Sequence, residues 1–486
     1  MIARRIRKLL IVASALLFCG SALFAQSGPG VDNNPGAATD TISQVLAPFE
    51  ERNPYWGGVP TGTAVPGVLP VSLEGAVQRG LKQNLGVLLS SDTLTAARGQ
   101  HWQMLSALLP SAVTETSLNT HQLDLKATIG LQIPNVPPVI GPFGVFDTRA
   151  YVSETVFDWQ SIERARSSNQ QVKAAQYNYR NARDLVVLAV TSNYLLAIAD
   201  EARVTSALAQ RDTAKALYQQ TSDQKRAGVA AAVDVLRSEV ELQGREQELI
   251  VARNSLAKQK LVLARVIGLP AGQAFDLTTE VAYQSLATMS LDEGLEFAYA
   301  HRPDYQSAIA QLQSAELQRK AAAAERYPSI SVEADYGDIG VTPATSHGTV
   351  NAAAVLKVPI FEGGKIHGDT LEATAARRQA SERLANLRAQ IDQDVRDAFF
   401  DLEASSARVS VEKNAITLAS ETLQQSRDRF ASGVTDNIEV VQAQESLATV
   451  NDAYIASLYS YNVAKISLAR AMGVAESNYA LYLKGQ

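Results

Sequence analysis

The sequence is poor in the residues that build crosslinks and metal centres. Among its 486 residues there is one cysteine, Cys19, and there are five histidines. A single cysteine excludes a disulfide scaffold and any zinc or iron–sulfur site made of several cysteines. The histidines are scattered and none forms an i, i+4 pair, so the sequence favours no metal site. They are His101, His121, His301, His347 and His367.

The motifs of common enzyme classes are also absent. The sequence has no G-x-G-x-x-G, no G-x-x-x-x-G-K-[ST], no H-E-x-x-H and no G-x-S-x-G. It therefore predicts no enzyme and no cofactor. A formal net charge of −6 argues against a nucleic-acid partner, because a phosphate-binding surface is basic. With 46% hydrophobic and 19% charged residues, the chain is neither disordered nor a multi-helix membrane protein.

Only the N-terminus holds a continuous apolar run. Four basic residues among the first eight precede Leu9–Phe18, which is typical of a secretory signal over residues 1–25, cleaved after Ala22 or Ala25. A retained membrane anchor and a lipoprotein modified on Cys19 are the alternatives. Cleavage removes four positive charges from the net −6 and leaves a cysteine-free chain of net charge −10. No later stretch has a clean 18-residue apolar run, so the exported chain is predicted to lack a transmembrane helix.

An internal duplication organises the rest of the chain. Val71–Val77 (VSLEGAV) and Met289–Leu295 (MSLDEGL) match at an offset of 218 residues, and the same offset places Pro110 on Pro328. Two glycine pairs match at an offset of 205, Gly228 with Gly433 and Gly268 with Gly473. Four landmarks in the same order indicate two copies of one unit. We therefore divide the chain into a Pro/Gly-rich leader (26–70), a first copy (71–270), a linker (271–288), a second copy (289–475) and a tail (476–486).

Each copy predicts the same succession of elements. A helix of about 37 residues, Ser72–Leu108 or Ser290–Arg326, ends at a proline. Two strands come next, and then a helix of about 66 residues, Ser161–Arg226 or Lys365–Ala431, which a glycine separates from a return helix. Leu185, Leu188, Ser192, Leu195 and Ala199 are spaced as a heptad seam. A helix of this length is roughly 100 Å long, more than a compact domain can hold.

The strands have one apolar and one polar face. Residues alternate in this way in Ile330–Tyr336, Val350–Val358 and Ala112–Leu118, and less cleanly in Thr148–Phe157. Apolar-out, polar-in alternation is the pattern of an outer-membrane β-barrel, with Glu115, Ser117, Glu333 and Asp335 lining the pore. A solvated sheet face is the alternative for these residues. Four strands cannot close a barrel, which needs about eight, so several copies must pool their strands.

The order of these motifs resembles the TolC family of outer-membrane efflux proteins over about residues 71–475. The matching motifs are the openings at Ser72 and Ser290, the helix-ending LPS and YPS at Pro110 and Pro328, the joint PIFEGG (359–364), and the turns RAGV (226–229) and ASGV (431–434). The resemblance implies an α+β membrane protein: a homotrimer whose 12-stranded outer-membrane barrel, with four strands per chain, continues as a long periplasmic α-helical barrel. Such proteins are passive exit ducts of tripartite efflux pumps or type I secretion systems.

The resemblance also implies functional residues. From the sequence alone, Gly228 and Gly433 are turn glycines that allow a left-handed backbone. In the family these turns form the periplasmic tip that docks the adaptor protein. The role carries over to Ala227, Gly228, Val229, Ser432, Gly433 and Val434.

A second set concerns the pore gate. Asp234 and Glu439 match at the offset of 205 and could form acidic rings in an oligomer. The alternative is a carboxylate that interacts with the dipole at a helix N-terminus. The family's second acidic gate position falls on Gln442, and its tyrosine and arginine positions fall on Phe430 and Thr435. The sequence keeps this gate only in part, so other contacts must hold any closed state.

We therefore expect an outer-membrane duct with its helical tube in the periplasm. Its expected partners are two further copies of the chain, a periplasmic adaptor, an inner-membrane transporter and outer-membrane lipid. The competing hypothesis is a soluble periplasmic coiled-coil scaffold without a pore. A periplasmic enzyme on a helical scaffold is a third class, and no residue cluster supports it.

Overall fold

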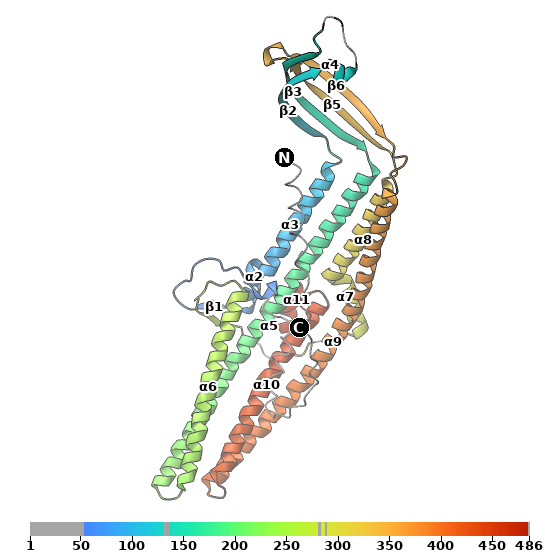
Figure 1. Cartoon of the computed structure of the whole chain (residues 1–486). Coiled ribbons are helices and arrows are strands. Elements are labelled where there is room, and N and C mark those ends of the chain that lie inside the picture. Colours follow the sequence, from blue (N-terminus) through green and yellow to red (C-terminus); the bar gives the residue numbers. More distant parts are fainter. Residues whose placement is uncertain (1–52, 131–133, 135, 280–282, 287–288, 485–486) are drawn as a thin grey trace, which may run out of the picture. The chain divides into compact units, whose positions relative to one another are not determined.

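The computed structural model describes residues 53–130, 134, 136–279, 283–286 and 289–484 (Figure 1). The predicted signal segment 1–25, Cys19 and the leader up to residue 52 lie outside the described residues. The helical elements are η1 (Pro54–Trp56), α2 (Leu73–Gln83), α3 (Leu85–Ser106), α4 (Leu125–Ile129), α5 (Trp159–Arg226), α6 (Ala232–Val266), α7 (Leu291–His301), α8 (Pro303–Ala324), η2 (Pro343–Thr345), α9 (Lys365–Ala431), α10 (Asn437–Ala471) and α11 (Ala475–Lys484). The strands are β1 (Leu69–Val71), β2 (Ser111–Asp124), β3 (Val139–Phe157), β4 (Phe275–Leu277), β5 (Ser329–Gly340) and β6 (His347–Lys357).

The first helix of each half is broken in two, so the prediction of one continuous helix over Ser72–Leu108 and over Ser290–Arg326 is wrong. Asn84 separates α2 from α3 and Arg302 separates α7 from α8, both with extended backbones. At Arg302 the cause is Pro303, which lacks an N–H and disfavours a helical backbone in the residue before it. At Asn84 the side-chain oxygen accepts a hydrogen bond from the N–H of Gly86 at 2.9 Å and so caps α3.

The two breaks make equivalent buried contacts. Asn84 is fully buried, and its Nδ2 donates to the carbonyl of Val266, the last residue of α6, at 3.4 Å. Arg302 is 3% exposed, and its Nη1 donates to the carbonyl of Ala471, the last residue of α10, at 3.4 Å. The donors are 218 residues apart and the acceptors 205, which are the offsets found in the sequence. This equivalence supports the duplication.

The long helices α5 and α9 have 68 and 67 residues and form hairpins with α6 and α10, which have 35 each. α5 packs against α3, α6, α8 and α10, while α9 packs against α8 and α10. α5 starts two residues before the predicted Ser161, because Asp158 accepts a hydrogen bond from the Gln160 N–H at 3.1 Å and caps the helix. Among the described helices, only α5 is long and apolar enough to cross a membrane, but 67% of its apolar window is buried, as expected for a core helix.

The four long strands form one antiparallel sheet in the order β2-β3-β5-β6. They cover the segments predicted from alternation except Val358, which lies one residue past the end of β6, and they extend beyond the predictions elsewhere. The register places Ala112, Val152, Ala334 and Ala352 side by side on one face, and it places Glu115 beside Arg149 on the other. In Figure 1 the sheet lies at one end of the helices, and the turns of the α5–α6 and α9–α10 hairpins lie at the other.

The segments outside the two copies contribute to the structure as well. β1 pairs in parallel with β4, so the end of the leader and the linker form a small two-stranded sheet. Residues 57–59 contact the α2–α3 break, where the N–H of Leu85 donates to the carbonyl of Gly57 at 2.9 Å and the N–H of Val59 to that of Gln83 at 2.8 Å. α11 occupies most of the predicted tail and packs against α5 and α10.

Candidate functional site: the helical turns and the polar sheet face

The two hairpin turns share one backbone geometry. In the first, the N–H of Val229 donates to the carbonyl of Gln224 at 2.9 Å and that of Gly228 to the carbonyl of Lys225 at 3.0 Å. The second repeats this pattern with Val434 and Gly433, as in a Schellman motif. Gly228 and Gly433 have φ of +78° and +69°, the left-handed conformation that the sequence predicted.

The turns leave an apolar side chain exposed at their tips. Val229 is 76% exposed and Val434 is 69% exposed, while Ala227, Ser432 and both glycines are exposed as well. The Ser432 hydroxyl bonds back to the carbonyl of Asp428 at 2.8 Å. The six residues assigned to adaptor docking therefore form two similar exposed surfaces, which we call the tip turns.

Asp234 lies in the first turn of α6. Its Oδ2 accepts a hydrogen bond from the N–H of Ala231 at 3.3 Å, and its Oδ1 lies 3.6 Å from Nη1 of Arg237. These contacts stabilise the start of the helix, which is the alternative weighed against an acidic ring. The ring stays a prediction.

Glu439 lies in the first turn of α10 and is paired across its own hairpin. Nη1 of Arg429, near the end of α9, donates to its Oε1 at 3.0 Å, and the two side chains are 56% and 36% exposed. Arg429 was not among the gate residues predicted from the sequence. A cation ten residues before the carboxylate, on the other side of a glycine turn, was the signal for it.

The other predicted gate residues are separated by the fold. Phe430 packs against the buried cluster of Leu217, Leu423, Val440 and Ala443 between α5, α9 and α10. Thr435 is half-buried in the second tip turn. Gln442 lies on the facing surface of α10, where it lines a groove between α6 and α10.

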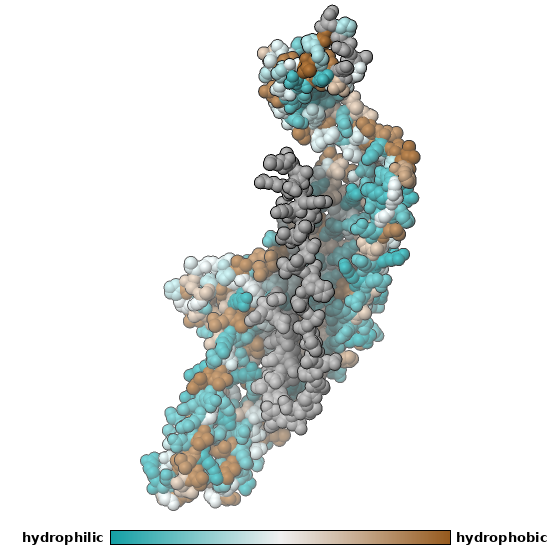
Figure 2. Space-filling view, in the orientation of Figure 1, coloured by the Kyte–Doolittle hydropathy of each residue, from teal (hydrophilic) through white to brown (hydrophobic). Residues whose placement is uncertain are grey.

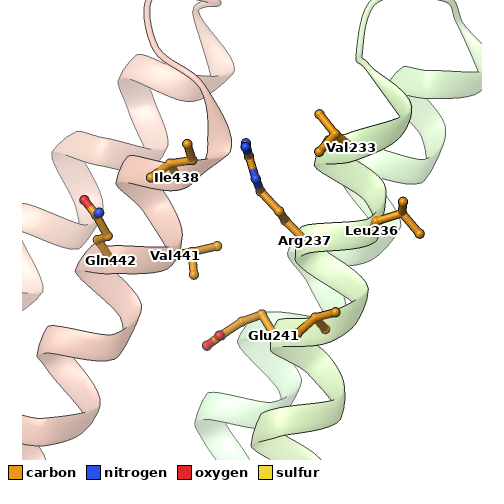
Figure 3. Close-up of a pocket in the computed structure, with 8 residues that line it drawn as sticks. Val233, Leu236, Arg237, Glu241, Ile438, Val441 and Gln442 are labelled. Carbon is orange, nitrogen blue, oxygen red and sulfur yellow. The ribbon is translucent and has the colours of Figure 1, made fainter.

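This groove lies close to the tip turns, between the first turns of α6 and α10. It has a volume of about 540 Å³ and is lined by Val233, Leu236, Arg237, Val240, Glu241, Ile438, Val441 and Gln442. Figure 3 shows Arg237 reaching from α6 toward α10 beside Ile438. The two hairpins are thus poorly packed against each other on this side.

One hydrogen bond bridges the hairpins at the groove. Asn437, the first residue of α10, is fully buried, and its Nδ2 donates to the main-chain carbonyl of Asp234 on α6 at 2.9 Å. Its Oδ1 has no hydrogen-bond partner among the described residues. No pattern in the sequence marks this asparagine, because the contact joins residues 203 positions apart.

The predicted pore-lining residues lie on one face of the sheet. The register places Glu115 and Ser117 of β2 on the same side as Glu333 and Asp335 of β5. They share this face with Arg149 of β3, which the sequence analysis missed and which bonds to Asp335. In the described part of the chain, here as elsewhere, no group of three or more histidine, cysteine, aspartate or glutamate side chains is placed to hold a metal ion.

Comparison with known proteins agrees with this arrangement. The profile of the family described as "Outer membrane efflux protein" matches residues 295–474. The chain is 22% identical to the toluene efflux pump outer membrane protein TtgC of Pseudomonas putida over 83% of each chain. It is 21% identical to the outer membrane protein TolC of Vibrio cholerae, covering 76% of this chain and 83% of TolC. The chain is a TolC-like outer-membrane efflux protein.

The fold of this TolC-like chain is also shared with solved channels. The structure of the Campylobacter jejuni CmeC outer membrane channel superposes with a TM-score of 0.73 at 16% identity, covering 85% of this chain and 88% of CmeC. A secreted-protease system supplies another relative: the alkaline protease secretion protein AprF of Pseudomonas aeruginosa is 22% identical over 68% of this chain and 70% of AprF.

Proposed function

We propose that this TolC-like chain is the outer-membrane exit duct of a tripartite efflux pump or a type I secretion system. The duct receives its substrate from an inner-membrane transporter through a periplasmic adaptor, and carries it across the periplasm and the outer membrane. The observation that carries the proposal is a four-stranded sheet with one apolar and one polar face on top of two long helical hairpins. The named relatives work in both kinds of export.

The chain forms a homotrimer in this proposal, because both sides of the molecule are left open. β2 and β6 are the edges of the sheet, and an open edge is not tolerated in lipid. The helices next to the sheet also leave apolar side chains exposed on both sides of the molecule. α6 exposes Ile250 and Leu261, and α9 exposes Phe400, Val411 and Leu418. A ring of copies that joins β6 to the next β2 and α9 to the next α6 buries all four.

The joint between sheet and helices suits the membrane boundary. Between β6 and α9, Ile360 is 95% exposed and Phe361 is 87% exposed, and Figure 2 shows hydrophobic surface there. Aromatic and apolar side chains gather at this level in outer-membrane barrels. A soluble scaffold would leave these residues and the apolar sheet face in water.

Detergent extraction tests the duct directly. We expect the protein to be released from membranes only by detergent, as a particle of three chains, and to give discrete conductance steps in a planar bilayer. Twelve strands from three copies close a barrel, whereas four cannot. A fully ordered monomer released without detergent would contradict the proposal.

The tip turns dock the adaptor in this proposal, and Asn437 ties the two hairpins together beside the groove. The hydrogen bond from the Asn437 side chain to the carbonyl of Asp234 ties α10 to α6 beside the groove. A buried hydrogen bond contributes about 1 kcal/mol, so its loss should favour separation of the hairpins about fivefold in each chain.

Replacing Asn437 with leucine is therefore expected to raise the open probability of single channels without reducing trimer formation. A matched control is Asn462→Leu, because Asn462 is also buried on α10 with an unpartnered Oδ1, but its Nδ2 bonds within its own helix, to Leu458, at 2.9 Å. If both variants open equally, general weakening of α10 explains the effect and Asn437 has no special part in closure.

A further inference from the structure

Arg149 lies across the polar face of the sheet and contacts three of its strands. Its Nε donates to Asp147 on β3 at 3.3 Å, its Nη1 to Asp335 on β5, and its Nη2 to the Thr349 hydroxyl on β6 at 3.0 Å. Only 14% of the side chain is exposed, although it stands on an open face of the sheet. The guanidinium is therefore held in one position by the sheet itself.

Gly337 makes this position possible. It is the residue of β5 directly opposite Arg149, and it is buried. A Cβ at 337 would lie 2.2 Å from the carbonyl oxygen of Thr148 and 2.8 Å from the Cβ of Arg149. The missing side chain lets the arginine lie flat and reach β6, where Thr349 in turn donates to the carbonyl of Gly337 at 3.2 Å.

The charges around Arg149 do not cancel. Glu115 stands directly opposite it on β2, on the same face as Asp147 and Asp335. This set of three carboxylates and one guanidinium, which we call the girdle, has a net charge of −2 in each chain. Glu333 and Lys357 lie on the same face nearer the helices and balance each other.

The opposite face of the sheet is suited to lipid. It carries alanine, valine and leucine, together with Glu154 near the helical end of β3 and Asp338 near the turn between β5 and β6. Its hydroxyl groups include a pair in which Thr116 and Thr148 bond to each other at 2.7 Å. The girdle face carries more charge, since Glu115, Asp147, Arg149, Glu333, Asp335 and Lys357 all lie on it, so the opposite face is the better suited of the two to lipid. The girdle therefore faces the lumen of the barrel.

We propose that the girdle makes the barrel itself a cation-selective filter, at the opposite end of the duct from the tip turns. The inference rests on the proposed trimeric barrel, in which three girdles form a ring of net charge −6 at one level of the lumen. A ring of fixed carboxylates attracts cations and repels anions. Cationic solutes are thus favoured for passage, and anionic solutes are opposed even when the tip is open.

Salt dependence follows from screening. The Debye length is about 10 Å at 0.1 M salt and 3 Å at 1 M. Carboxylates on the wall of a wide pore therefore act on passing ions at low ionic strength. We expect a potassium-to-chloride permeability ratio above one at 0.1 M potassium chloride that falls toward one at 1 M.

The test is the reversal potential of single channels across a potassium chloride gradient, with Glu115→Gln and Asp335→Asn combined. This variant leaves Asp147 to balance Arg149, so the girdle becomes neutral and the permeability ratio at low salt should fall clearly below the wild-type ratio. The matched control is Glu154→Gln with Asp338→Asn, which removes two carboxylates from the other face of β3 and β5. The control should keep the wild-type ratio.

The possible results distinguish a failure of the girdle proposal from a failure of the proposed duct. The double variant could give channels of wild-type conductance and an unchanged potassium-to-chloride permeability ratio. That result would contradict the role of the girdle without contradicting the proposed duct. If the permeability ratio fell in the control variant alone, the other face of the sheet would line the lumen, which would also contradict the girdle. Absence of any channel from the wild-type protein would instead contradict the proposed duct. Arg149→Gln is a second probe, expected to raise the ratio.

Discussion

Replacing Arg302 with leucine should lower the free energy of unfolding of the helical region by about 3 kcal/mol, because it removes a buried cation and leaves the largely buried carboxylate of Asp304 without its nearest positive charge. Nε and Nη2 of Arg302 hold Asp304 at 3.1 and 2.7 Å, and Nη1 holds Asp394 on α9 at 2.9 Å. Nη1 also reaches the end of α10, at the carbonyl of Ala471. One side chain thus ties α8, α9 and α10 together at the break between α7 and α8.

The pH dependence of this variant follows from Asp304. Burial raises the pKa of its carboxyl, but the hydrogen bonds and charge of Arg302, with the charge of Arg470, outweigh burial and hold the pKa below its ordinary value. A lowered pKa in the folded state stabilises the protein above the unfolded-state pKa, and this stability is lost as the pH falls through the folded-state pKa. Without Arg302, the pKa of Asp304 should rise, because burial is then opposed only by the charge of Arg470 and the hydrogen bond from the Tyr305 N–H. The difference in free energy of unfolding between the wild-type protein and Arg302→Leu should therefore be largest at neutral pH and become smaller in acid.

Hydrogen exchange in detergent measures the effect locally, at the amides of α8 and at the end of α10. Arg319→Leu is the matched control, since Arg319 pairs with Glu316 on the same helix but the two side chains are 35% and 32% exposed. An exposed pair contributes 0–1 kcal/mol. Equal losses in the two variants would mean that burial of the Arg302 network adds nothing.

Local patterns in the sequence predicted the long helices α5 and α9 and the four long strands. Glycines with left-handed backbones end α5 and α9, as at Gly228 and Gly433, and the absence of proline allows helices of 68 and 67 residues. Alternation located all four long strands. These features depend on neighbours in the chain, so a single sequence contains them.

The tertiary contacts could not be predicted from these local patterns. Asn84 breaks a helix without proline or glycine, because its amide is used by the buried carbonyls of Tyr55 and Val266. Asn437 and Arg149 act through partners 203 and 186 residues away. Of the predicted gate residues, the fold leaves Phe430 in a packed cluster and pairs Glu439 with Arg429. Which side chains meet is set by register and helix packing, and residue types alone do not specify either.

Replacing Gly433 with valine is expected to abolish efflux while leaving the trimer intact. An L-residue at a φ of +69° costs about 1–2 kcal/mol, and a β-branched one more, so the second tip turn must change its shape. Apart from its two chain neighbours, no described residue has an atom within 4 Å of a Cβ at this position, so the strain meets no packed core and should stay within the turn. The long helices and the sheet do not depend on it.

Export in living cells is the decisive measurement for this variant. Cells that carry Gly433→Val in place of the wild-type protein should become as drug-sensitive as cells without it, although detergent extraction still yields a trimer. Gly368→Val is the matched control, because Gly368 lies at the other end of α9 with a helical backbone and equally open space around its Cβ. That variant should keep wild-type resistance. Wild-type resistance with Gly433→Val would remove the second tip turn from adaptor docking, since a reshaped turn could not present Ser432 and Val434 to a partner in the same way.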